Sequence, residues 1–319
     1  MEKAVSQIGI DPLEYFSLPP RRTIEVDNTS RGNGPVTIYD FLEAPAHYTE
    51  TFGLQWNKYR DVQIDRFNGT QGSYRHLQLF AQGDLSVFQE ATCLEIGSGA
   101  GRFTDYLVDL CKRVITVEPS QALTVNAALG APNLIAAHAD LFQIPVRREK
   151  IDVVFCRGVT QHTSDTQAAI RRLFDYAKPG GIVLFDVYPL RWYTPFVTKY
   201  WLRPFLRHIK PASFMKLAER WVPKLLRFKK RYITSCLPDN VWGRNIGSQI
   251  VPVADFTQTL NSKDEETRML WSILDTVDMY TPRYDRPMTY GSILRTLNAV
   301  GAKNILANKS SFCFRAVAP

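Results

Sequence analysis

The chain has 319 residues, of which 45% are hydrophobic and 22% charged, a usage that matches folded globular proteins and argues against a fibre or a disordered chain. The net charge of +8 is unevenly spread, because residues 191–231 hold twelve Lys or Arg and one acid, Glu219, so that this segment carries +11 and the rest of the chain −3. No window holds the roughly 18 consecutive apolar residues needed to cross a bilayer, and the amino terminus lacks the regions of a signal peptide. We therefore expect a cytoplasmic protein.

The five cysteines are scattered and include no C-x-x-C pair, which disfavours both a disulfide framework and a structural zinc site. No cluster of His, Asp and Glu has the spacing of metal ligands, and Asp186, at the end of a predicted strand, is a lone acid. We expect five thiols and no bound metal.

Residues 1–88 show little strand-like alternation and are predicted to form an N-terminal cap. Loops are expected at PPRR (19–22) and RGNGP (31–35), where proline, glycine and asparagine favour turns. From residue 39 to 80 the pattern becomes helical, with Phe52, Trp56 and Tyr59 spaced four and three residues apart. One face of this helical region is expected to pack on the rest of the molecule.

Short β-branched segments alternate with helical ones in residues 89–190. Near-continuous apolar strands of this kind are typical of a parallel sheet covered on both faces. The pattern predicts a Rossmann-like, doubly wound α/β fold, with this segment as its ligand-binding half. Its strands are expected at 91–96, 113–118, 133–139, 151–157 and 182–188, and its helices at 102–112, 120–129 and 166–177.

The α/β pattern stops after the fifth strand and returns near residue 256. Residues 191–255 are predicted to form an insertion with two basic amphipathic helices, each interrupted by a proline, Pro204 and Pro223. Residues 256–319 are predicted to complete a mostly parallel, seven-stranded sheet. Their helices are expected at 263–274 and 289–300, and their strands at 303–306 and 312–317.

The first predicted strand ends in the stretch CLEIGSGAGRF, with glycine at positions 97, 99 and 101. Glycines at a strand-to-helix turn allow the backbone to lie against a bound nucleoside or its tail, because a Cβ would collide with it. The dinucleotide fingerprint would require a further glycine where this chain has Arg102. The spacing is E-x-G-x-G-x-G instead, beginning at Glu95.

Acidic side chains end the next two predicted strands. Glu118 lies in VITVEPS, at the end of the second strand, and Asp140 lies in AHADLF, at the end of the third. RGVTQHTSD follows the fourth strand, and LFDYAKPGGIVLF leads into the fifth. Together with LEIGSGAGRF, these segments resemble in order the motifs of class I S-adenosylmethionine-dependent methyltransferases of the type 11 or type 25 kind.

This resemblance implies S-adenosylmethionine as the cofactor and a role for each motif. It implies that Glu118 accepts both ribose hydroxyls and that Asp140 accepts from the adenine amino group, while Leu141 covers the ring. Glu95 either helps to hold the methionine amino group or orders the turn. The implied cofactor-binding set is Glu95, Gly97, Ser98, Gly99, Gly101, Glu118, Pro119, Asp140, Leu141, Arg157 and Gly158.

Methyl transfer from a sulfonium is an in-line displacement, so the protein mainly has to align the reactants and exclude water. A hydroxyl acceptor also benefits from a general base. His162, in the loop after the fourth strand, is the candidate base, and a structural role in that loop or a role at the methionine end is the alternative. Cys156 lacks the sequence context of a covalent methyltransferase nucleophile.

The acceptor is expected to be chosen by the parts added to the α/β core. FGLQWNKYRDVQID, before the glycine turn, and LDTVDMYTPRYDRPMTYGSILRTLNAVGAKNI, near the end, resemble methyltransferases of bacterial glycan and secondary-metabolite gene sets. That resemblance implies a sugar or glycan-lipid hydroxyl as the acceptor. The residues predicted to contact the acceptor or form a lid are Gln55, Trp56, Tyr59, Tyr188 and Trp192.

Three interpretations of the basic segment 191–231 stay open. It can bind a phosphorylated or lipid-linked acceptor, lie on an anionic membrane surface, or serve as a solvated face or subunit contact. RNA is a rival partner, disfavoured because the rest of the chain is slightly acidic. Three hypotheses of function follow: a methyltransferase of small-molecule or glycan-type oxygen acceptors, an RNA methyltransferase, and a non-catalytic module that binds S-adenosylmethionine.

Overall fold

The computed structural model of the protein describes residues 11–27, 35–43, 53, 58–236, 246–247, 249–256 and 265–319. The chain divides into two compact units. One unit, here called the α/β unit, combines Met1–Thr49, Ser73–Leu190 and Tyr284–Pro319. The other, here called the helical unit, combines Glu50–Gly72 and Arg191–Arg283.

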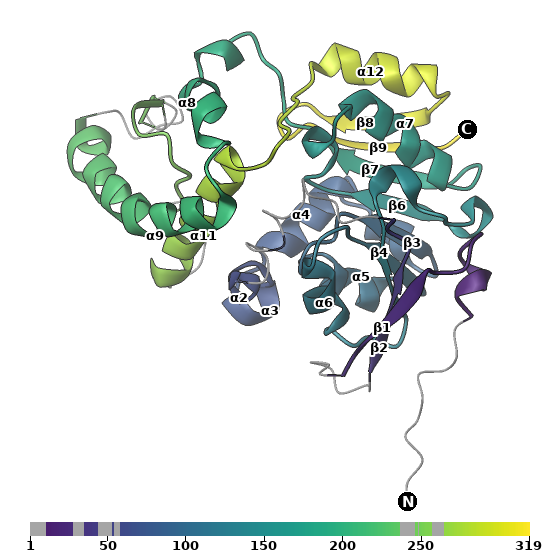
Figure 1. The fold of residues 1–319 in the computed structure, drawn as a ribbon. Helices are drawn as coiled ribbons and strands as arrows, with labels where there is room; N and C mark the ends of the chain where they lie inside the picture. The colour runs from purple at the N-terminus through teal and green to yellow at the C-terminus, as the bar shows by residue number, and fades with distance from the viewer. Residues whose placement is uncertain are drawn as a thin grey trace, which may run out of the picture. The chain divides into compact units, whose positions relative to one another are not determined.

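A single mixed sheet of nine strands forms the centre of the α/β unit (Figure 1). Its strands are β1 (Arg22–Val26), β2 (Val36–Asp40), β3 (Thr92–Ile96), β4 (Arg113–Val117), β5 (Leu134–His138), β6 (Val153–Cys156), β7 (Ile182–Asp186), β8 (Lys303–Asn308) and β9 (Cys313–Val317). Six neighbouring strands run parallel in the order β2-β5-β4-β3-β6-β7. β1 is antiparallel to β2 at one edge, and β9 and β8 continue antiparallel beyond β7 at the other.

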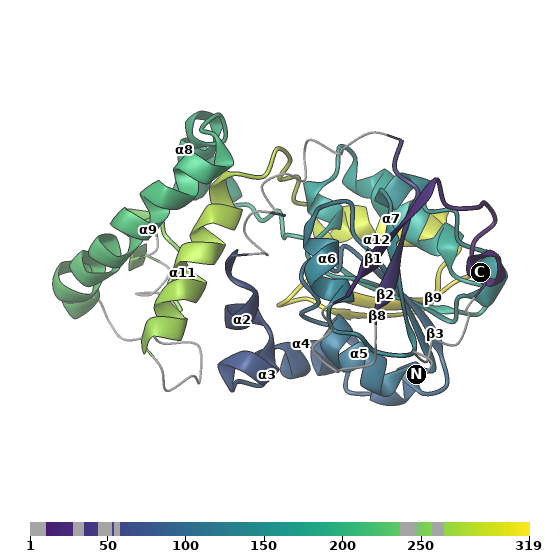
Figure 2. The same ribbon diagram turned by 60° about the horizontal axis from the view of Figure 1, so that its bottom comes forward.

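Helices cover both faces of this sheet, as the sequence pattern predicts (Figure 2). The α-helices are α4 (Gly72–Phe80), α5 (Thr104–Leu110), α6 (Ala122–Ala127), α7 (Thr166–Tyr176) and α12 (Tyr290–Ala299), with short 3-10 turns at η1 (Pro12–Glu14), η3 (Leu85–Phe88), η4 (Leu141–Gln143), η5 (Arg148–Lys150) and η6 (Thr160–His162). On one face, Leu94 of β3 joins a buried cluster with Leu173 of α7 and Leu297 of α12. On the other face, Phe155 of β6 joins one with Phe80 of α4.

The sheet has nine strands among the described residues, not the predicted seven, and the two additional ones lie in the segment assigned to a helical cap. β2 pairs in parallel with β5, where Ile38 is opposite Ala136, and β1 pairs with β2. The prediction was wrong here because β1 shows no strand-like pattern of burial, with only Val26 of its five residues buried. An exposed edge strand carries no apolar alternation that would reveal it.

The helical unit holds the other helices. Its elements are α2 (Arg60–Gln63), α3 (Asp65–Asn68), η7 (Thr194–Phe196), α8 (Thr198–Leu206), α9 (Pro211–Phe228), the π-helical turn η8 (Lys229–Ile233), η9 (Thr234–Cys236) and α11 (Glu265–Tyr280). Both basic helices form as predicted, but α8 and α9 continue through Pro204 and Pro223. None of the described helices is both long and apolar enough to cross a membrane.

Residues 265–280 belong to the helical unit and not to the second half of the α/β core, where the sequence placed them. Helix α11 packs against α9 and α8, and its Trp271 and Leu274 share a buried cluster with Phe214 and Val222 of α9. Figure 2 shows α9 and α11 side by side. Helical periodicity predicts that α11 has an apolar face, but it does not say which element that face meets.

Two cations of the basic segment are structural, which the count of charges does not reveal. The guanidinium of Arg203 is buried and donates to the carbonyl oxygen of Pro282, and the buried ammonium of Lys229 lies 2.9 Å from Asp255 Oδ2. These two side chains hold the helical unit together. They therefore do not contribute to its cationic surface.

Candidate functional site

The carboxyl ends of the parallel strands meet at one edge of the sheet, which is where open α/β sheets bind ligands. The glycine turn follows β3, the loop with Glu118 follows β4, and Asp140 follows β5. Arg157 and His162 follow β6, and Asp186 ends β7. The topology thus brings the sequence-predicted residues of the α/β unit to a single edge, although they come from the ends of five strands.

Glu118 is buried, and backbone amides hold both of its carboxylate oxygens. The N–H of Gly99 in the glycine turn donates to Oε2 at 3.1 Å, and the N–H of Ser120 donates to Oε1 at 3.0 Å. Burial raises the pKa of the Glu118 carboxyl, while the hydrogen bonds from Ser120 and Gly99 act in the opposite direction. The loops after β3 and β4 are therefore joined through this one carboxylate.

Two glycines of the turn are required by contacts within the chain itself. Gly97 has φ +72°, and a Cβ there would lie 2.1 Å from Cγ2 of Val159 in the loop after β6. Gly101 has φ +96°, and a Cβ there would lie 2.8 Å from Cδ1 of Leu129. Close approach of a bound ligand is the reason expected from the sequence for these glycines, but the packing of neighbouring segments is already a sufficient reason for both.

Glu95 lies inside the α/β unit in a buried polar network. Its Oε2 accepts hydrogen bonds from the hydroxyls of Thr104 at 2.5 Å and Thr116 at 3.3 Å, and the Asn126 amide donates to both hydroxyl oxygens at 2.9 and 3.0 Å. Burial raises the pKa of the Glu95 carboxyl to about 8. These contacts join β3, β4, α5 and α6, and they favour the interpretation that Glu95 orders the turn.

Asp140 and Leu141 lie directly after β5. Asp140 caps the turn η4, because its Oδ1 accepts from the N–H of Phe142 at 2.9 Å. Leu141 is buried, and its carbonyl accepts the hydroxyl of Tyr176 at 2.7 Å. The turn that would lie against an adenine ring is thus anchored to α7, while the predicted contacts of both side chains with adenine stay predictions.

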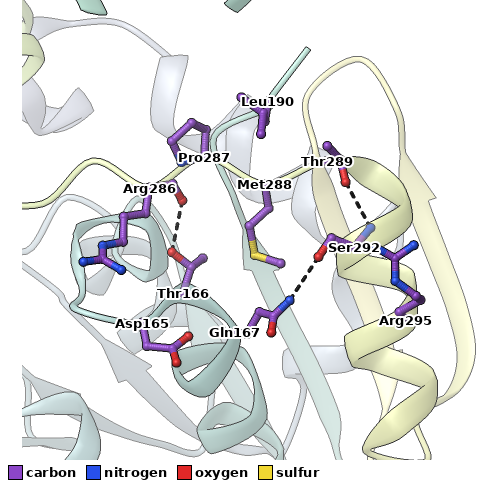
Figure 3. A pocket seen from close by; sticks show the side chains of 10 residues that line it. All are labelled: Asp165, Thr166, Gln167, Leu190, Arg286, Pro287, Met288, Thr289, Ser292 and Arg295. Carbon is purple, nitrogen blue, oxygen red and sulfur yellow. Dashed lines mark hydrogen bonds between the residues drawn. The ribbon is translucent and has the colours of Figure 1, made fainter. Parts of the chain in front are cut away.

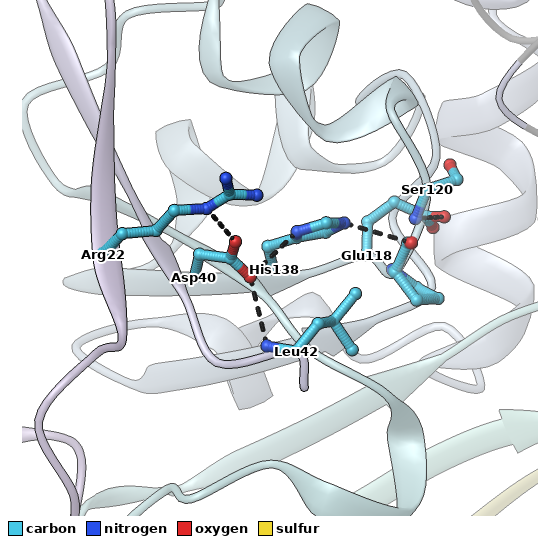
Figure 4. A network of polar contacts seen from close by, with 7 residues as sticks. Arg22, Asp40, Leu42, Glu118, Ser120 and His138 are labelled. Atoms are coloured by element: carbon cyan, nitrogen blue, oxygen red, sulfur yellow. Dashed lines mark hydrogen bonds and ion pairs between the residues drawn. The ribbon is translucent and has the colours of Figure 1, made fainter. Parts of the chain in front are cut away.

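A polar chain that the sequence analysis missed leads from the edge of the sheet to the Glu118 loop (Figure 4). Arg22 donates to Asp40 Oδ2 at 2.6 Å, and Leu42 N–H donates to Oδ1 at 3.1 Å. His138 lies 3.1 Å from Asp40 Oδ1 through Nδ1 and 3.1 Å from the carbonyl oxygen of Pro119 through Nε2. Since a carboxylate and a carbonyl only accept, both ring nitrogens act as donors, which is the pattern of an imidazolium.

The electrostatics of Asp40 agree with this arrangement. Burial opposes the ionisation of Asp40, but the hydrogen bonds from Arg22 and Leu42 and the charge of His138 outweigh it and lower the pKa of the Asp40 carboxyl. Asp40 lies at the end of β2, a strand that the sequence analysis did not predict. The only available signal was the histidine two residues before Asp140 in AHADLF.

The loop after β6 carries the candidate base. His162 is buried, and its Nδ1 donates to the carbonyl of Tyr284 at 2.9 Å. The neutral ring therefore carries its proton on Nδ1 and has Nε2 as its acceptor nitrogen. The ring of Tyr188 lies edge-on to it, with centroids 5.4 Å apart. In the same loop, Gly158 N–H donates to Asp186 Oδ1 at 2.6 Å, and burial raises the pKa of the Asp186 carboxyl.

Three buried polar atoms in the loops at this edge have no hydrogen-bond partner among the described residues. They are Oγ of Ser98, in the glycine turn, Nε of Arg157, directly after β6, and Nε2 of Gln161, in the turn η6. Buried polar groups in native proteins are nearly always paired, so each such exception needs an explanation. A polar molecule bound at the carboxyl edge, with acceptors for Ser98 and Arg157, supplies one for two of them. The residues present thus fit a ligand such as S-adenosylmethionine.

The predicted acceptor-side residues from the helical unit are placed only in part. Gln55 and Trp56 lie outside the described residues. Tyr59 is buried, its hydroxyl donates to Glu219 Oε1 at 2.5 Å, and burial raises the pKa of that hydroxyl. Among the described residues, Trp192 is the most exposed large apolar side chain, at 84%. The roles of these residues at an acceptor stay predictions.

A cavity of about 340 Å³ lies where the N-terminal ends of α7 and α12 meet (Figure 3). The Gln167 side chain donates to Ser292 Oγ at 3.0 Å, and Thr166 Oγ1 donates to the carbonyl of Arg286 at 3.0 Å. The sequence alone does not reveal this cavity, because its walls come from segments about 120 residues apart. Its lining residues are Asp165, Thr166, Gln167, Leu190, Arg286, Pro287, Met288, Thr289, Ser292 and Arg295.

Metal ligands are not grouped in the part of the chain that the structure describes: no cluster of three or more His, Cys, Asp or Glu is arranged to hold a metal ion there. The five cysteines are unpaired thiols, four of them buried. Asp186, the acid singled out at the end of the fifth predicted strand, instead accepts from the backbone of Gly158.

Residues 94–185, which contain β3 to β7 and the loops described above, match the family model described as a methyltransferase domain. This part of the chain is a class I methyltransferase domain of the S-adenosylmethionine-dependent type, as the resemblance of its motifs implies.

Curated relatives share this domain. A probable S-adenosylmethionine-dependent methyltransferase of Mycolicibacterium smegmatis is 29% identical, over 28% of this chain and 35% of the relative. A ubiquinone biosynthesis O-methyltransferase of Rhodopseudomonas palustris is 26% identical, over 47% of this chain and 55% of the relative. A tRNA U34 carboxymethyltransferase of Desulforapulum autotrophicum is 28% identical, over 33% of this chain and 34% of the relative. The chain thus spans about a third to about half of the length of these relatives.

Proposed function

We propose that the protein is an S-adenosylmethionine-dependent methyltransferase that acts on an oxygen of a small-molecule or glycan-type acceptor. The observation that carries the proposal is the buried carboxylate of Glu118, which the N–H groups of Gly99 and Ser120 fix beside the glycine turn. An ionised carboxylate has about four acceptor sites. Two of them are therefore left for the ribose hydroxyls.

The other cofactor contacts follow from the same edge of the sheet. Asp140 and Leu141 would hold the adenine, since they follow β5, the strand next to β4. Ser98 Oγ and Arg157 Nε, which lack partners among the described residues, are donors suited to the carboxylate at the methionine end. The direct contact of Glu95 with the methionine amino group is the weaker part of this assignment, because two threonine hydroxyls already bind its carboxylate.

S-adenosylmethionine, when bound, supplies an electrophilic methyl group on a sulfonium. What the chain itself must provide is alignment, exclusion of water and, for a hydroxyl acceptor, a base. His162 is suited to that role, because its hydrogen bond to the Tyr284 carbonyl orients the ring and makes Nε2 the basic nitrogen. Tyr188, edge-on to His162, would then contact the acceptor.

The acceptor class rests on two observations. The ubiquinone relative is by name an O-methyltransferase, and the sequence around Trp56 and in residues 274–291 resembles enzymes of glycan and secondary-metabolite gene sets. A phosphorylated or lipid-linked acceptor would suit the basic segment 191–231. We further propose a cytoplasmic location.

An RNA acceptor is the second candidate. The basic helices expose many cations, and one relative is by name a tRNA-modifying enzyme. This alternative predicts steeply salt-dependent binding of RNA. It also predicts that the affinity is lost when Lys199, Arg207 and Arg220 are replaced together by glutamine. Arg203 is left out of that set because it is buried.

Calorimetric binding of S-adenosylhomocysteine, the demethylated product, tests the proposal. Glu118→Ala should lower the affinity tenfold or more, because charge-assisted hydrogen bonds contribute roughly 1.5–3 kcal/mol each. Glu149→Ala, which removes an exposed acid of the same unit, should leave it unchanged. A folded wild-type protein that binds neither S-adenosylmethionine nor its product would sink the proposal. Binding without turnover on any acceptor would favour the non-catalytic module.

A further inference from the structure

Helix α9 carries two apolar stripes, and the core of the helical unit uses only one of them. Phe214, Ala218, Val222 and Leu226 are buried and pack in the cluster that contains α11. A second set, Leu217, Trp221 and Phe228, is exposed although its spacing of four and seven residues also places it on one helical face. A helix that only had to cover α11 would need no second apolar stripe.

The preceding segment exposes still more apolar surface. Trp201 is 65% exposed and Phe205 is 76% exposed, one turn apart on α8, which also packs against α11. Phe196, in η7, is 71% exposed. Large apolar side chains that gather on the surface of a protein, instead of occurring singly, mark a site of interaction.

Exposed cations alternate with these apolar side chains along the same part of the chain. The exposed ones are Arg207, Lys210, Lys216, Arg220, Lys224, Arg227, Lys230 and Arg231. The single acid of residues 191–236, Glu219, forms an ion pair with Lys58 and accepts a hydrogen bond from Tyr59. The surface is therefore strongly positive, and it presents aromatic rings and cations together: Lys224 lies 4.9 Å from the centroid of the Trp221 ring.

We infer that α8 and α9 dock on the surface of an anionic lipid bilayer. A helix that lies in the interfacial plane combines Trp, Phe and Leu on one side with Lys and Arg beside them. Each cation near an anionic surface is attracted to it and adds to the binding, and Trp and Phe bury apolar area at the boundary of headgroups and acyl chains. The exposed Leu202 and Leu217 favour lipid over RNA, because an aliphatic side chain cannot stack on a base as an aromatic one can.

This inference is independent of methyl transfer, because lipid binding is measured without S-adenosylmethionine or acceptor. The first experiment is co-sedimentation of the protein with vesicles of phosphatidylglycerol and phosphatidylcholine, or of phosphatidylcholine alone. We expect at least tenfold stronger partitioning to the anionic vesicles, weakened by salt. We also expect a blue shift of tryptophan emission, since all six tryptophans belong to the helical unit. Failure of the wild-type protein to bind the anionic vesicles would overturn the inference.

Variants separate the apolar contribution from the electrostatic one. The triple variant Trp201→Ala, Phe205→Ala, Trp221→Ala should lower partitioning at least tenfold, and its circular dichroism should stay native because all three side chains are exposed. Unchanged partitioning of this folded variant would contradict docking through the apolar stripes.

The charge variants test the preference for anionic lipid. Replacing Arg207, Lys216, Arg220 and Arg227 by glutamine should remove that preference. Replacing three exposed cations of the α/β unit, Lys112, Arg171 and Lys303, should not. Tight binding of a single-stranded RNA homopolymer, with no binding of vesicles, would assign the surface to RNA instead.

Discussion

The α/β unit and the helical unit differ in how completely they bury their apolar side chains. In the α/β unit, strand β3 is buried on both sides, with Cys93 and Leu94 both at 0% exposure on opposite faces. In the helical unit, α9 buries Leu226 on one side and exposes Leu217 on the other. The α/β unit exposes only aliphatic side chains such as Leu18 and Leu306 among its large apolar residues, and none of its described Phe or Tyr residues is among the exposed ones. The helical unit has apolar surface left for a partner.

The most direct way to test this contrast compares two leucines on one helix. Leu226→Ala should destabilise the helical unit by about 2–5 kcal/mol, the range for a leucine removed from a packed core. Leu217→Ala should change stability by less than about 0.5 kcal/mol, because its side chain is exposed. Urea unfolding followed by tryptophan fluorescence reports on this unit alone, because the α/β unit contains no tryptophan. Equal losses would show that both faces of α9 are core.

In the α/β unit, the tight packing is tested at the glycine turn. Gly97→Ala should cost about 2–4 kcal/mol, because a new Cβ meets Val159 and the backbone has a positive φ. Gly158→Ala is the matched control: its φ is also +72°, but nothing lies within 4 Å of the added atom, so it carries only the backbone cost of about 1–2 kcal/mol. Unfolding followed by far-UV circular dichroism measures both.

The double variant Gly97→Ala, Val159→Ala identifies the cause of the larger effect. Val159→Ala removes both γ-methyl groups, including the one at 2.1 Å, and leaves only its Cβ at 3.2 Å. The double variant should therefore recover most of the difference in stability between the two single glycine variants. If the double variant loses as much free energy of unfolding as the two single variants Gly97→Ala and Val159→Ala together, the collision is not what makes Gly97 necessary.

The sequence predicts the central strands well, and the reason is physical. Strands β3 to β7 are buried on both faces, so each is a short apolar run bounded by turn residues, and parallel order then places their ends together. β1 was missed because an exposed edge strand has no such signal. β2 lies between β1 and β5 and alternates buried and half-buried residues, but its five residues were included in a segment interpreted as a cap. Helix α11 was assigned to the wrong unit because its periodicity describes its own face and not its neighbour.

The order of the motifs along the chain predicts which residues lie at the carboxyl edge of the sheet, but not their side-chain contacts. Glu118 and Asp140 follow the neighbouring parallel strands β4 and β5, so their place at the edge follows from the topology. The inward contacts of Glu95 and the pairing of His138 with Asp40 depend on side chains from elements far apart in the chain, which no local pattern brings together. The same limit hid the structural role of Arg203.

The burial of Glu95 in the α/β core can be tested by the pH dependence of the free energy of unfolding. Its pKa is raised to about 8 by burial, against 4.5 for an unperturbed glutamate. Protonation of Glu95 therefore contributes to the free energy of unfolding. This contribution is fully present below pH 4.5 and is lost as the pH rises through about 8, by up to about 1.4 kcal/mol per pH unit. Glu95→Gln removes this contribution. Urea unfolding should therefore show a larger drop in the free energy of unfolding between pH 5.5 and 7.5 for the wild type than for Glu95→Gln. Equal drops in the two proteins would show that Glu95 is ionised throughout this range.

The smallest expected effect concerns the hydrogen bonds of His138, which connect Asp40 of β2 to the loop that carries Glu118. His138 donates to Asp40 and to the carbonyl of Pro119, the residue directly after Glu118. His138→Gln can keep only one of these contacts, so we expect the affinity for S-adenosylhomocysteine to fall about fivefold, equivalent to one hydrogen bond of about 1 kcal/mol. Turnover at saturating S-adenosylmethionine should stay within twofold of the wild type, because His138 touches no reacting atom. Asp40→Asn should reproduce the loss of affinity more weakly, since an amide oxygen can still accept from His138. A variant that lost turnover and kept its affinity would place His138 in the chemistry and not in positioning the loop.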